Sequence, residues 1–261
     1  MAFESACVRY PGAIRNAVDG VCLAVNPGEF VVLLGPSGCG KSSLLRTVNR
    51  MVNLDSGRVL VGDREVRSIE PTKLRRGIGY VIQAVGLFSH MTVAQNIAVV
   101  PTLLRWDRTK IASRVDELLN LVELNPGNYA GRFPRELSGG EQQRVGVARA
   151  IAAQPEVLLM DEPFGAVDAI VRARLQDAAL RIARTLKTTV LFVTHDVDEA
   201  LRLADRIVVM KDGQVVQFDT PLQILSRPAT EYVEALLDTK DVVRQLALLT
   251  VRDAMHPVAL G

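Results

Sequence analysis

The stretch Gly35-Pro36-Ser37-Gly38-Cys39-Gly40-Lys41-Ser42-Ser43 decides the fold of this chain of 261 residues. It follows an apolar run at residues 30–34 and precedes a helix-compatible segment, so a strand, a glycine-rich loop and a helix are predicted in that order. The pattern G-x-x-x-x-G-K-S is typical of the P-loop, whose backbone N–H groups and helix N-terminus surround a phosphate. We therefore predict a nucleoside triphosphate site, in which Lys41 adds a positive charge and Ser42 offers its hydroxyl to Mg²⁺.

The composition is that of an ordinary globular protein. The chain has a mass of 28.5 kDa and is 48% hydrophobic, which is enough to build a normal core. Its 31 Lys and Arg residues nearly balance 29 Asp and Glu, and a net charge of +2 gives no reason to expect a nucleic-acid partner. No apolar run approaches the roughly 18 residues of a membrane span. A role at a membrane would therefore need another subunit to cross the bilayer.

The cysteines and the N-terminus indicate a cytoplasmic protein. Cys7, Cys22 and Cys39 are odd in number and lack the spacing of metal ligands. The chain does not open with a basic segment followed by an apolar stretch, as a secretory signal would. We therefore expect a reducing compartment.

The first third of the chain is rich in predicted strands. Segments 3–10, 18–25 and 29–34 are separated by turn signals and are predicted as short antiparallel strands, the third of which feeds the P-loop. A helix from residue 41 to about residue 51 follows, with further strands at 58–61 and 78–81.

A helical block interrupts this pattern between residues 92 and about 120. Its second helix begins after Asp107-Arg108-Thr109 and carries one apolar face, which is formed by Ile111, Val115, Leu118, Leu119 and Val122. We therefore predict an inserted helical subdomain at about residues 88–152.

Beyond Pro134 the pattern is that of an α/β protein. The continuous apolar run 157–160 predicts a strand buried on both faces of a parallel sheet, and it stops at Asp161-Glu162. The predicted elements that follow are a helix at about 169–187, a buried strand at 189–194 that ends at His195, a helix at 197–204, a hairpin at 207–216 and short helices from residues 221 and 230.

A second motif narrows the class of protein. Residues 137–145, Leu-Ser-Gly-Gly-Glu-Gln-Gln-Arg-Val, place Ser138, Gly139, Gly140 and Glu141 at a predicted helix start, where exposed N–H groups make another anion site. A helix-capping serine with a capping-box glutamate at the wrong offset would explain Ser138 alone, and not two glycines in a helix. With the P-loop and Asp161-Glu162, this stretch closely resembles the ABC-transporter ATPase family.

That resemblance implies a fold and an assembly. The fold is α/β, a P-loop NTPase (RecA-like) mixed-sheet core with an N-terminal antiparallel β subdomain and the inserted helical subdomain. It implies one ATPase domain over residues 1–238. It also implies a head-to-tail homodimer, in which the P-loop of one subunit and the Ser-Gly-Gly stretch of the other enclose each ATP.

The resemblance also assigns roles to residues at strand ends. Asp161 is expected to anchor Mg²⁺ directly or through water, together with Ser42, and Glu162 to polarise the attacking water. Gln83 resembles the glutamine that senses Mg²⁺ and the γ-phosphate, and His195 the histidine that contacts the γ-phosphate. Taken alone, acidic residues at strand ends and a glutamine are usually solvated, and a lone histidine is usually structural.

Two further positions match the family less completely. Tyr10 is the candidate for the ring that stacks on adenine, with core packing at an edge strand as the alternative. Asp168 corresponds to the loop that communicates across the dimer, although the usual serine and leucine of that loop are replaced by Gly165 and Val167.

The helical block resembles one branch of the family. Residues 80–107 are similar to the ATPases of bacterial quaternary-amine importers, which take up glycine betaine, carnitine or choline. The expected partners are integral membrane permease subunits and, indirectly, an extracytoplasmic substrate-binding protein, at the cytoplasmic face of the inner membrane. The tail at 239–261 resembles only the opening of a nucleotide-sensing CBS module and is expected to be too short for a folded one.

Two other classes remain as alternatives. A soluble ABC ATPase of DNA repair or translation usually carries a long coiled-coil insertion or two tandem ATPase units, and neither fits in this chain. A P-loop kinase or GTPase would bind nucleotide but would leave the Ser-Gly-Gly stretch without a role. The sequence therefore favours an ATP-hydrolysing importer subunit.

Overall fold

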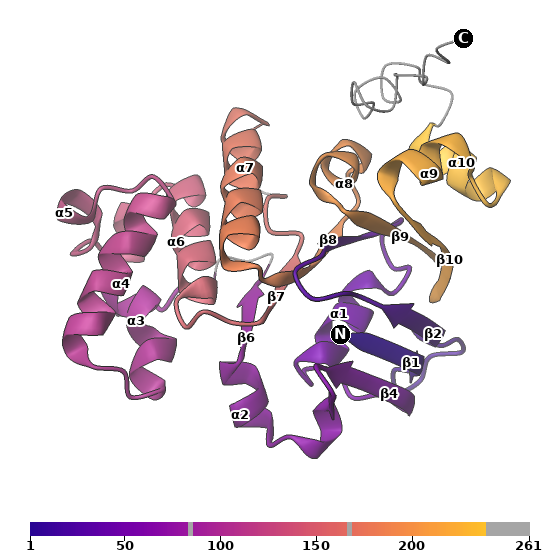
Figure 1. Cartoon of the computed structure of the whole chain (residues 1–261), viewed down its shortest axis with the longest axis horizontal. Helices are drawn as coiled ribbons and strands as arrows, with labels where there is room; N and C mark the ends of the chain where they lie inside the picture. The colour runs from indigo at the N-terminus through magenta and orange to yellow at the C-terminus, as the bar shows by residue number, and fades with distance from the viewer. Residues whose placement is uncertain (83–85, 166–168, 239–261) are drawn as a thin grey trace, which may run out of the picture.

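The computed structural model describes residues 1–82, 86–165 and 169–238, and it holds two β-sheets with helices packed on them (Figure 1). The smaller sheet has the strand order β2-β1-β4-β5 and the larger one β10-β9-β3-β8-β7-β6. The strands of the smaller sheet are β1 (Ala2–Val8), β2 (Val18–Ala24), β4 (Ser56–Val61) and β5 (Arg64–Glu65). Those of the larger are β3 (Phe30–Leu34), β6 (Ile78–Val81), β7 (Val157–Asp161), β8 (Thr189–Thr194), β9 (Arg206–Lys211) and β10 (Gln214–Asp219).

The larger sheet is mixed, as predicted. Strands β9, β3, β8, β7 and β6 pair in parallel, and β10 pairs with β9 antiparallel through a hairpin. The grouping of the third N-terminal strand with antiparallel strands is wrong, because β3 lies between β8 and β9 and runs parallel to both. All five of its residues are buried, which is the pattern of a strand covered on both faces.

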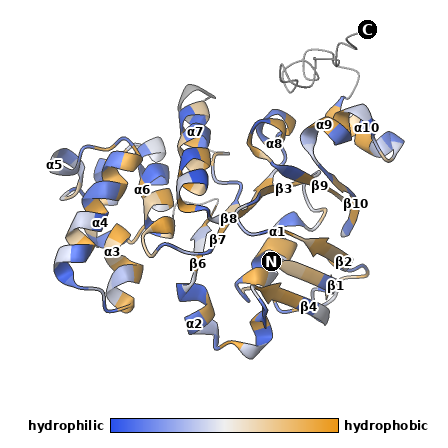
Figure 2. Cartoon of the chain, viewed as in Figure 1, coloured by the Kyte–Doolittle hydropathy of each residue, from blue (hydrophilic) through white to orange (hydrophobic). Residues whose placement is uncertain are grey.

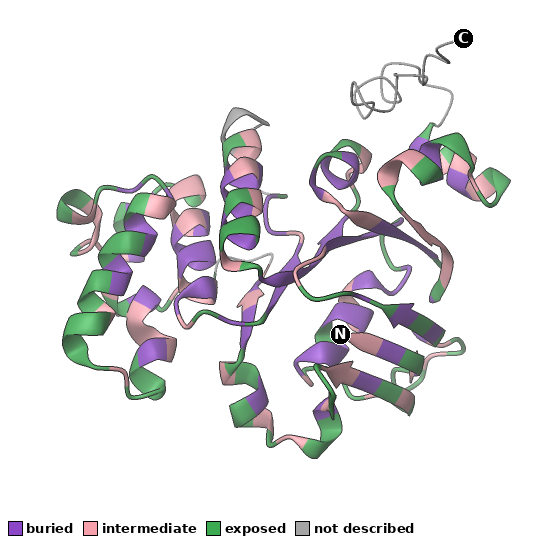
Figure 3. Ribbon diagram, in the orientation of Figure 1, coloured by how far each residue is buried: buried purple, intermediate pink, exposed green. Residues whose placement is uncertain are grey.

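Strand β3 divides two hydrophobic cores. Val31 and Leu33 point into the core shared with helix α1 (Lys41–Val48) and the smaller sheet. Phe30, Val32 and Leu34 point into the core on the opposite face, where the Phe30 and Phe192 rings lie 5.7 Å apart between centroids. Figure 3 shows the resulting buried layer along the larger sheet. Because both faces are covered, the loop that leaves β3 starts from a rigid point.

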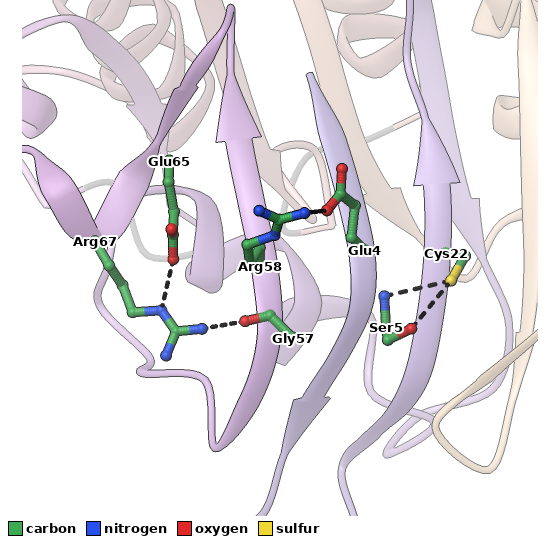
Figure 4. A network of polar contacts seen from close by, with 7 residues as sticks. All are labelled: Glu4, Ser5, Cys22, Gly57, Arg58, Glu65 and Arg67. Atoms are coloured by element: carbon green, nitrogen blue, oxygen red, sulfur yellow. Dashed lines mark hydrogen bonds and ion pairs between the residues drawn. The ribbon is translucent and has the colours of Figure 1, made fainter.

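The smaller sheet is covered by α1 on one face and carries polar contacts on the other. In β1 and β4 the Arg58 and Glu4 side chains form an exposed ion pair of 2.5 Å, and beyond them Arg67 contacts Glu65 and the Gly57 carbonyl (Figure 4). Helix α1 lies between the two sheets, since its buried side chains share one hydrophobic core with residues of both (Figure 1). It ends at Val48, a few residues before the predicted end.

The helices inserted between β6 and β7 gather at one end of the molecule (Figure 1). They are α3 (Val93–Leu103), α4 (Arg108–Leu121), α5 (Pro126–Tyr129) and α6 (Gly139–Ile151). The predicted apolar face of α4 is confirmed, since Val115, Leu118 and Leu119 are buried. Helix α4 begins at Arg108, two residues before the predicted start, because the Asp107 side chain caps it by accepting hydrogen bonds from the N–H groups of residues 109 and 110.

The remaining helices complete the core. They are α2 (Pro71–Arg76), which precedes β6, α7 (Ala169–Leu186), α8 (Val197–Leu203), α9 (Pro221–Ser226) and α10 (Glu231–Leu237). Hydrophobic and hydrophilic residues occupy different sides of the long helices (Figure 2). Within the described residues, no helix combines the length and the apolar character needed to cross a membrane.

Candidate nucleotide-binding site

The P-loop connects β3 to α1, and its last glycine requires the absence of a side chain. Gly40, which caps α1, has a φ of +104°, and a Cβ atom there would overlap the Ala17 carbonyl oxygen. Gly38 also has a positive φ, of +80°, with open space around it. The loop can therefore turn its backbone N–H groups toward an anion, as the sequence predicts.

Lys41 lies inside this loop with its ammonium group hydrogen-bonded to backbone carbonyls. Its side chain is buried, and Nζ donates hydrogen bonds of 2.6 Å to the Gly35 carbonyl and 2.9 Å to the Pro36 carbonyl. Cys39 is buried beside it, and burial raises the pKa of this thiol, so Cys39 is a neutral packing residue. The loop therefore holds a cation of the kind that forms charge-assisted hydrogen bonds with phosphate.

Ser42 and Asp161 meet at the carboxyl end of the sheet. The Ser42 hydroxyl donates a 2.7 Å hydrogen bond to Oδ1 of Asp161, although the two residues are 119 positions apart in sequence. Asp161 ends β7 and is 3% exposed. The predicted metal-binding pair is thus brought together.

The oxygen atoms of this pair fit Mg²⁺. Hydroxyl and carboxylate oxygens are the ligands that this hard cation prefers, and neighbouring ligands of an octahedral ion at about 2.1 Å lie about 3 Å apart. The 2.7 Å between the Ser42 and Asp161 oxygens is close to that value. Among the described residues no group of three or more His, Cys, Asp or Glu side chains could hold a metal, so this pair would need further ligands of other kinds.

Arg46 is a member of the site that the sequence did not reveal. Its Nη2 atom lies 2.9 Å from Oδ2 of Asp161, and its Nε donates to the Tyr80 hydroxyl at 3.3 Å. The spacing in the sequence could have indicated this residue, because residue 46 lies about one helical turn after Ser42 and therefore on the same face of α1.

Glu162 and His195 follow the ends of two neighbouring strands, β7 and β8. Glu162 has a φ of +45°, which is unusual for a residue with a side chain, and its N–H donates to the Val193 carbonyl at 3.1 Å. This backbone bond directs the Glu162 side chain toward His195, and Oε1 lies 3.3 Å from His195 Nδ1. A backbone held in a sparsely populated conformation by the neighbouring strand is typical of functional sites.

Ser138 caps α6 with a complete capping box. Its hydroxyl accepts from the Glu141 N–H, and the Glu141 carboxylate accepts from the Ser138 N–H at 2.7 Å. The expectation of a wrong offset is therefore incorrect, because Glu141 is the third residue of the helix, where a capping glutamate belongs. The hydrogen bond from Tyr129, followed by that from the Ser138 N–H, lowers the pKa of Glu141. The cap explains Ser138 and Glu141, and the two glycines still require another reason.

Helix α6, which begins after Ser138, packs against a different strand from the one that leads into the P-loop. Helix α6 packs beside β6, which is three strand positions from β3 in the sheet, or about 14 Å at the usual strand spacing. Nothing lies within 4 Å of the position of a Cβ on Gly139, so this side of the helix start is open. Buried Gln143 of α6 contacts the Pro163 carbonyl and thereby connects the helix to the loop after Glu162.

Tyr10 follows β1 and reaches the start of α1. Its hydroxyl lies 3.0 Å from the Ser43 hydroxyl, and 44% of the residue is exposed. The ring is therefore beside the P-loop helix and is not packed in the core. Gln83 and Asp168, the other two predicted site residues, lie outside the described residues.

The mostly parallel larger sheet and the glycine-rich loop after its strand β3 define a P-loop NTPase cassette. Comparison with known proteins gives the family. The profile of the ABC transporter family matches residues 18–165, and this chain belongs to that family.

Similar proteins include two transport subunits. The carnitine transport ATP-binding protein OpuCA of Listeria monocytogenes is 47% identical over 253 residues, which cover 95% of this chain and 63% of the relative. The glycine betaine uptake system ATP-binding protein YehX of Escherichia coli K12 is 50% identical over 240 residues, covering 92% of this chain and 78% of the relative. The chain thus spans slightly less than two thirds of the length of the first of these relatives.

A solved structure supports the same class. The dimeric ATP-binding cassette MJ0796, in a post-hydrolysis state with ADP and phosphate, is 29% identical and superposes with a TM-score of 0.75 over 84% of this chain and 98% of that one. The predicted P-loop NTPase fold is confirmed by this likeness.

Proposed function

We propose that this chain is the ATP-hydrolysing subunit of an importer for a quaternary-amine osmoprotectant such as glycine betaine, carnitine or choline. The observation that carries the substrate class is the 50% identity to the glycine betaine uptake subunit over 92% of the chain. The whole of residues 1–238 would be one ATPase domain, with its helical part at about 88–152.

The site supplies groups for phosphoryl transfer to water. Residues 35–43 would hold the triphosphate, with Tyr10 against the adenine and Lys41 on the phosphates. Ser42, Asp161 and Gln83 would hold Mg²⁺, which when bound neutralises charge on the phosphate oxygens. Glu162 would accept a proton from the attacking water, and His195 would contact the γ-phosphate while its Nδ1 stays against Glu162.

The arrangement of the two anion sites supports a dimer. Ser138, Gly139 and Gly140 begin a helix that packs beside β6, three strand positions from β3, so we expect a second copy to supply them to the phosphate held by this P-loop. The dimeric state of the MJ0796 cassette supports this assembly. Asp168 would lie at the same interface. When the γ-phosphate leaves, the contact between Lys41 of one subunit and Ser138 of the other is lost, so the dimer opens.

A cavity between the sheet edge and the helical group suits a helix of a membrane permease. It has a volume of about 860 Å³, and its lining includes the exposed apolar side chains Met51 and Phe88 together with Arg76 and Arg149. A partner docked there would touch both the core and the helices and would be moved when they move. The chain would then act at the cytoplasmic face of the inner membrane, with a substrate-binding protein on the other side.

Uptake measurements in cells test the proposal. Deletion of the gene in a strain without redundant importers should abolish uptake of labelled glycine betaine or choline under osmotic stress. The unmodified gene should restore uptake and the Glu162→Gln variant should not. Unchanged uptake in the deletion strain would remove the substrate class. Copurification with an integral membrane protein would separate an importer from a soluble ABC ATPase of DNA repair or translation.

A further inference from the structure

Asp161 carries a buried negative charge with two partners of different kinds. Its side chain is only 4% exposed, and an unpaired carboxylate at that depth would be strongly destabilising. The Ser42 hydroxyl satisfies Oδ1 without adding charge, whereas the Arg46 guanidinium at 2.9 Å from Oδ2 supplies the opposite charge.

The guanidinium of Arg46 stands where it would compete with a cation on Asp161. A metal ion and a guanidinium repel one another at a shared carboxylate, so full occupancy by one weakens the other. The Arg46 side chain is 44% exposed and lines the large cavity, which gives it space to leave. Asp161 is held by β7 and has no such freedom.

A second contact of Arg46 would connect its release from Asp161 to strand β6. Its Nε donates to the Tyr80 hydroxyl at 3.3 Å, so one guanidinium joins α1 and β7 to β6. Strand β6 leads into the segment that holds Gln83. Displacing Arg46 from Asp161 therefore removes one link between the metal-binding strand end and β6.

We infer that Arg46 is a positioning residue that holds the Asp161 carboxylate in place of the metal, and that binding of Mg²⁺ with nucleotide releases it. The inference rests on the proposed role of Asp161 as a metal anchor. It predicts that the charge of Arg46 stabilises the metal-free protein and lowers its affinity for the metal.

The test compares Arg46→Gln, Arg46→Lys and the unmodified full chain. Mn²⁺ is titrated by electron paramagnetic resonance with saturating ADP, and thermal unfolding is followed with ADP in either EDTA or Mg²⁺. Arg58→Gln is the matched control, because it removes an exposed ion pair with Glu4 on the smaller sheet (Figure 4).

Arg46→Gln should bind Mn²⁺ about fivefold more tightly, as loss of a competing charged hydrogen bond implies. In EDTA its melting temperature should fall by about 3 °C, and Mg²⁺ should recover most of that loss. Arg46→Lys should behave as the unmodified chain, and Arg58→Gln should show no difference between EDTA and Mg²⁺ beyond that of the unmodified chain. An unchanged or weaker Mn²⁺ affinity in Arg46→Gln would overturn the role inferred for Arg46 and would leave the metal assignment of Asp161 standing. Absence of any Mg²⁺ effect on the unmodified chain with ADP would overturn the metal assignment as well.

Discussion

The Nδ1 atom of His195 lies 3.3 Å from Oε1 of Glu162, and this contact joins residues that follow two neighbouring parallel strands. The backbone of Glu162 adopts a φ of +45° and is tied to Val193 in β8. The same sheet therefore places a carboxylate and an imidazole side by side where the carboxyl ends of the strands open to solvent. A water molecule between them and a bound phosphate would have both an acceptor for its proton and a group to orient it.

Glu162→Gln should abolish turnover and keep nucleotide binding. The amide retains the shape of the side chain but cannot accept the proton, so kcat should fall by about 100-fold or more. The variant should retain ATP and accumulate as a dimer in size-exclusion chromatography with ATP. Exposed Glu156, which precedes β7, provides the control Glu156→Gln, expected to hydrolyse ATP as the unmodified chain does. Hydrolysis by Glu162→Gln near the unmodified rate would refute the assignment of the base.

Mixing two inactive variants should restore activity. Lys41→Ala disables the P-loop and Ser138→Arg disables the second anion site, so a mixed dimer contains one intact composite site. Random pairing should give about a quarter of the unmodified rate. Mixing Lys41→Ala with the double variant Lys41→Ala/Ser138→Arg should give no hydrolysis. If the first mixture stayed as inactive as its components, the shared site would be wrong.

Tyr10 should act through its ring and not through its hydroxyl. Tyr10→Ala should weaken ATP binding about tenfold or more, since stacking on a base contributes about 1–3 kcal/mol. Tyr10→Phe loses only the 3.0 Å contact with Ser43 and should bind nearly as the unmodified chain. Binding is measured by titration with a fluorescent ATP analogue, with GTP as a competitor. Equal losses in the two variants would indicate that the contact with Ser43, and not stacking, is what matters.

The buried Glu199 should make stability fall as pH rises. Desolvation raises the pKa of this carboxyl above its ordinary 4.5, although hydrogen bonds that include one from Gln176 at 2.9 Å oppose the shift. The folded state then binds the proton more tightly than the unfolded state, so the stability that protonation provides is fully present below pH 4.5 and is lost above it.

Glu199→Gln removes this dependence while keeping a hydrogen-bond acceptor for Gln176. The free energy of unfolding of the unmodified chain, measured in urea, should decline relative to the variant as the pH rises above 4.5. The difference should be about 1.4 kcal/mol for each unit by which the pKa is raised. Glu156→Gln controls for removal of one carboxylate at the surface. Parallel curves for the unmodified chain and Glu199→Gln would show that burial does not shift this group.

The local sequence pattern was sufficient to predict many helices and strands, because the tertiary environment favoured the same structures as the short-range signals. Strand β8 spans the predicted residues 189–194, since a continuous apolar run between turn signals has no competing structure. The start of α4 was predicted to within two residues because its cap, Asp107, lies within the same segment. The capping box at Ser138 also needs only local atoms, and the correct count of positions would have found it.

Other features depend on which strands become neighbours. Strand β3 was grouped with the antiparallel strands because turn signals separate it from two of them in sequence, whereas coverage on both faces places it in the parallel part of the larger sheet. The partnership of Arg46 with Asp161 joins residues 115 positions apart, and no local pattern predicts it. Such contacts are decided by long-range packing, because the order of the strands in the sheet determines which side chains become neighbours.

The sequence by itself determined that a phosphate-binding loop follows a buried strand, because glycine freedom, lysine charge and helix polarity are local properties of residues 35–43. It also predicted a second anion site, formed by serine and glycine residues, elsewhere in the chain. Only the tertiary structure decided that Ser42 and Arg46 both contact the carboxylate of Asp161. It also decided that Glu162 faces His195. The physical reason is that parallel strands bring their carboxyl ends to one edge of the sheet, whatever their separation in sequence.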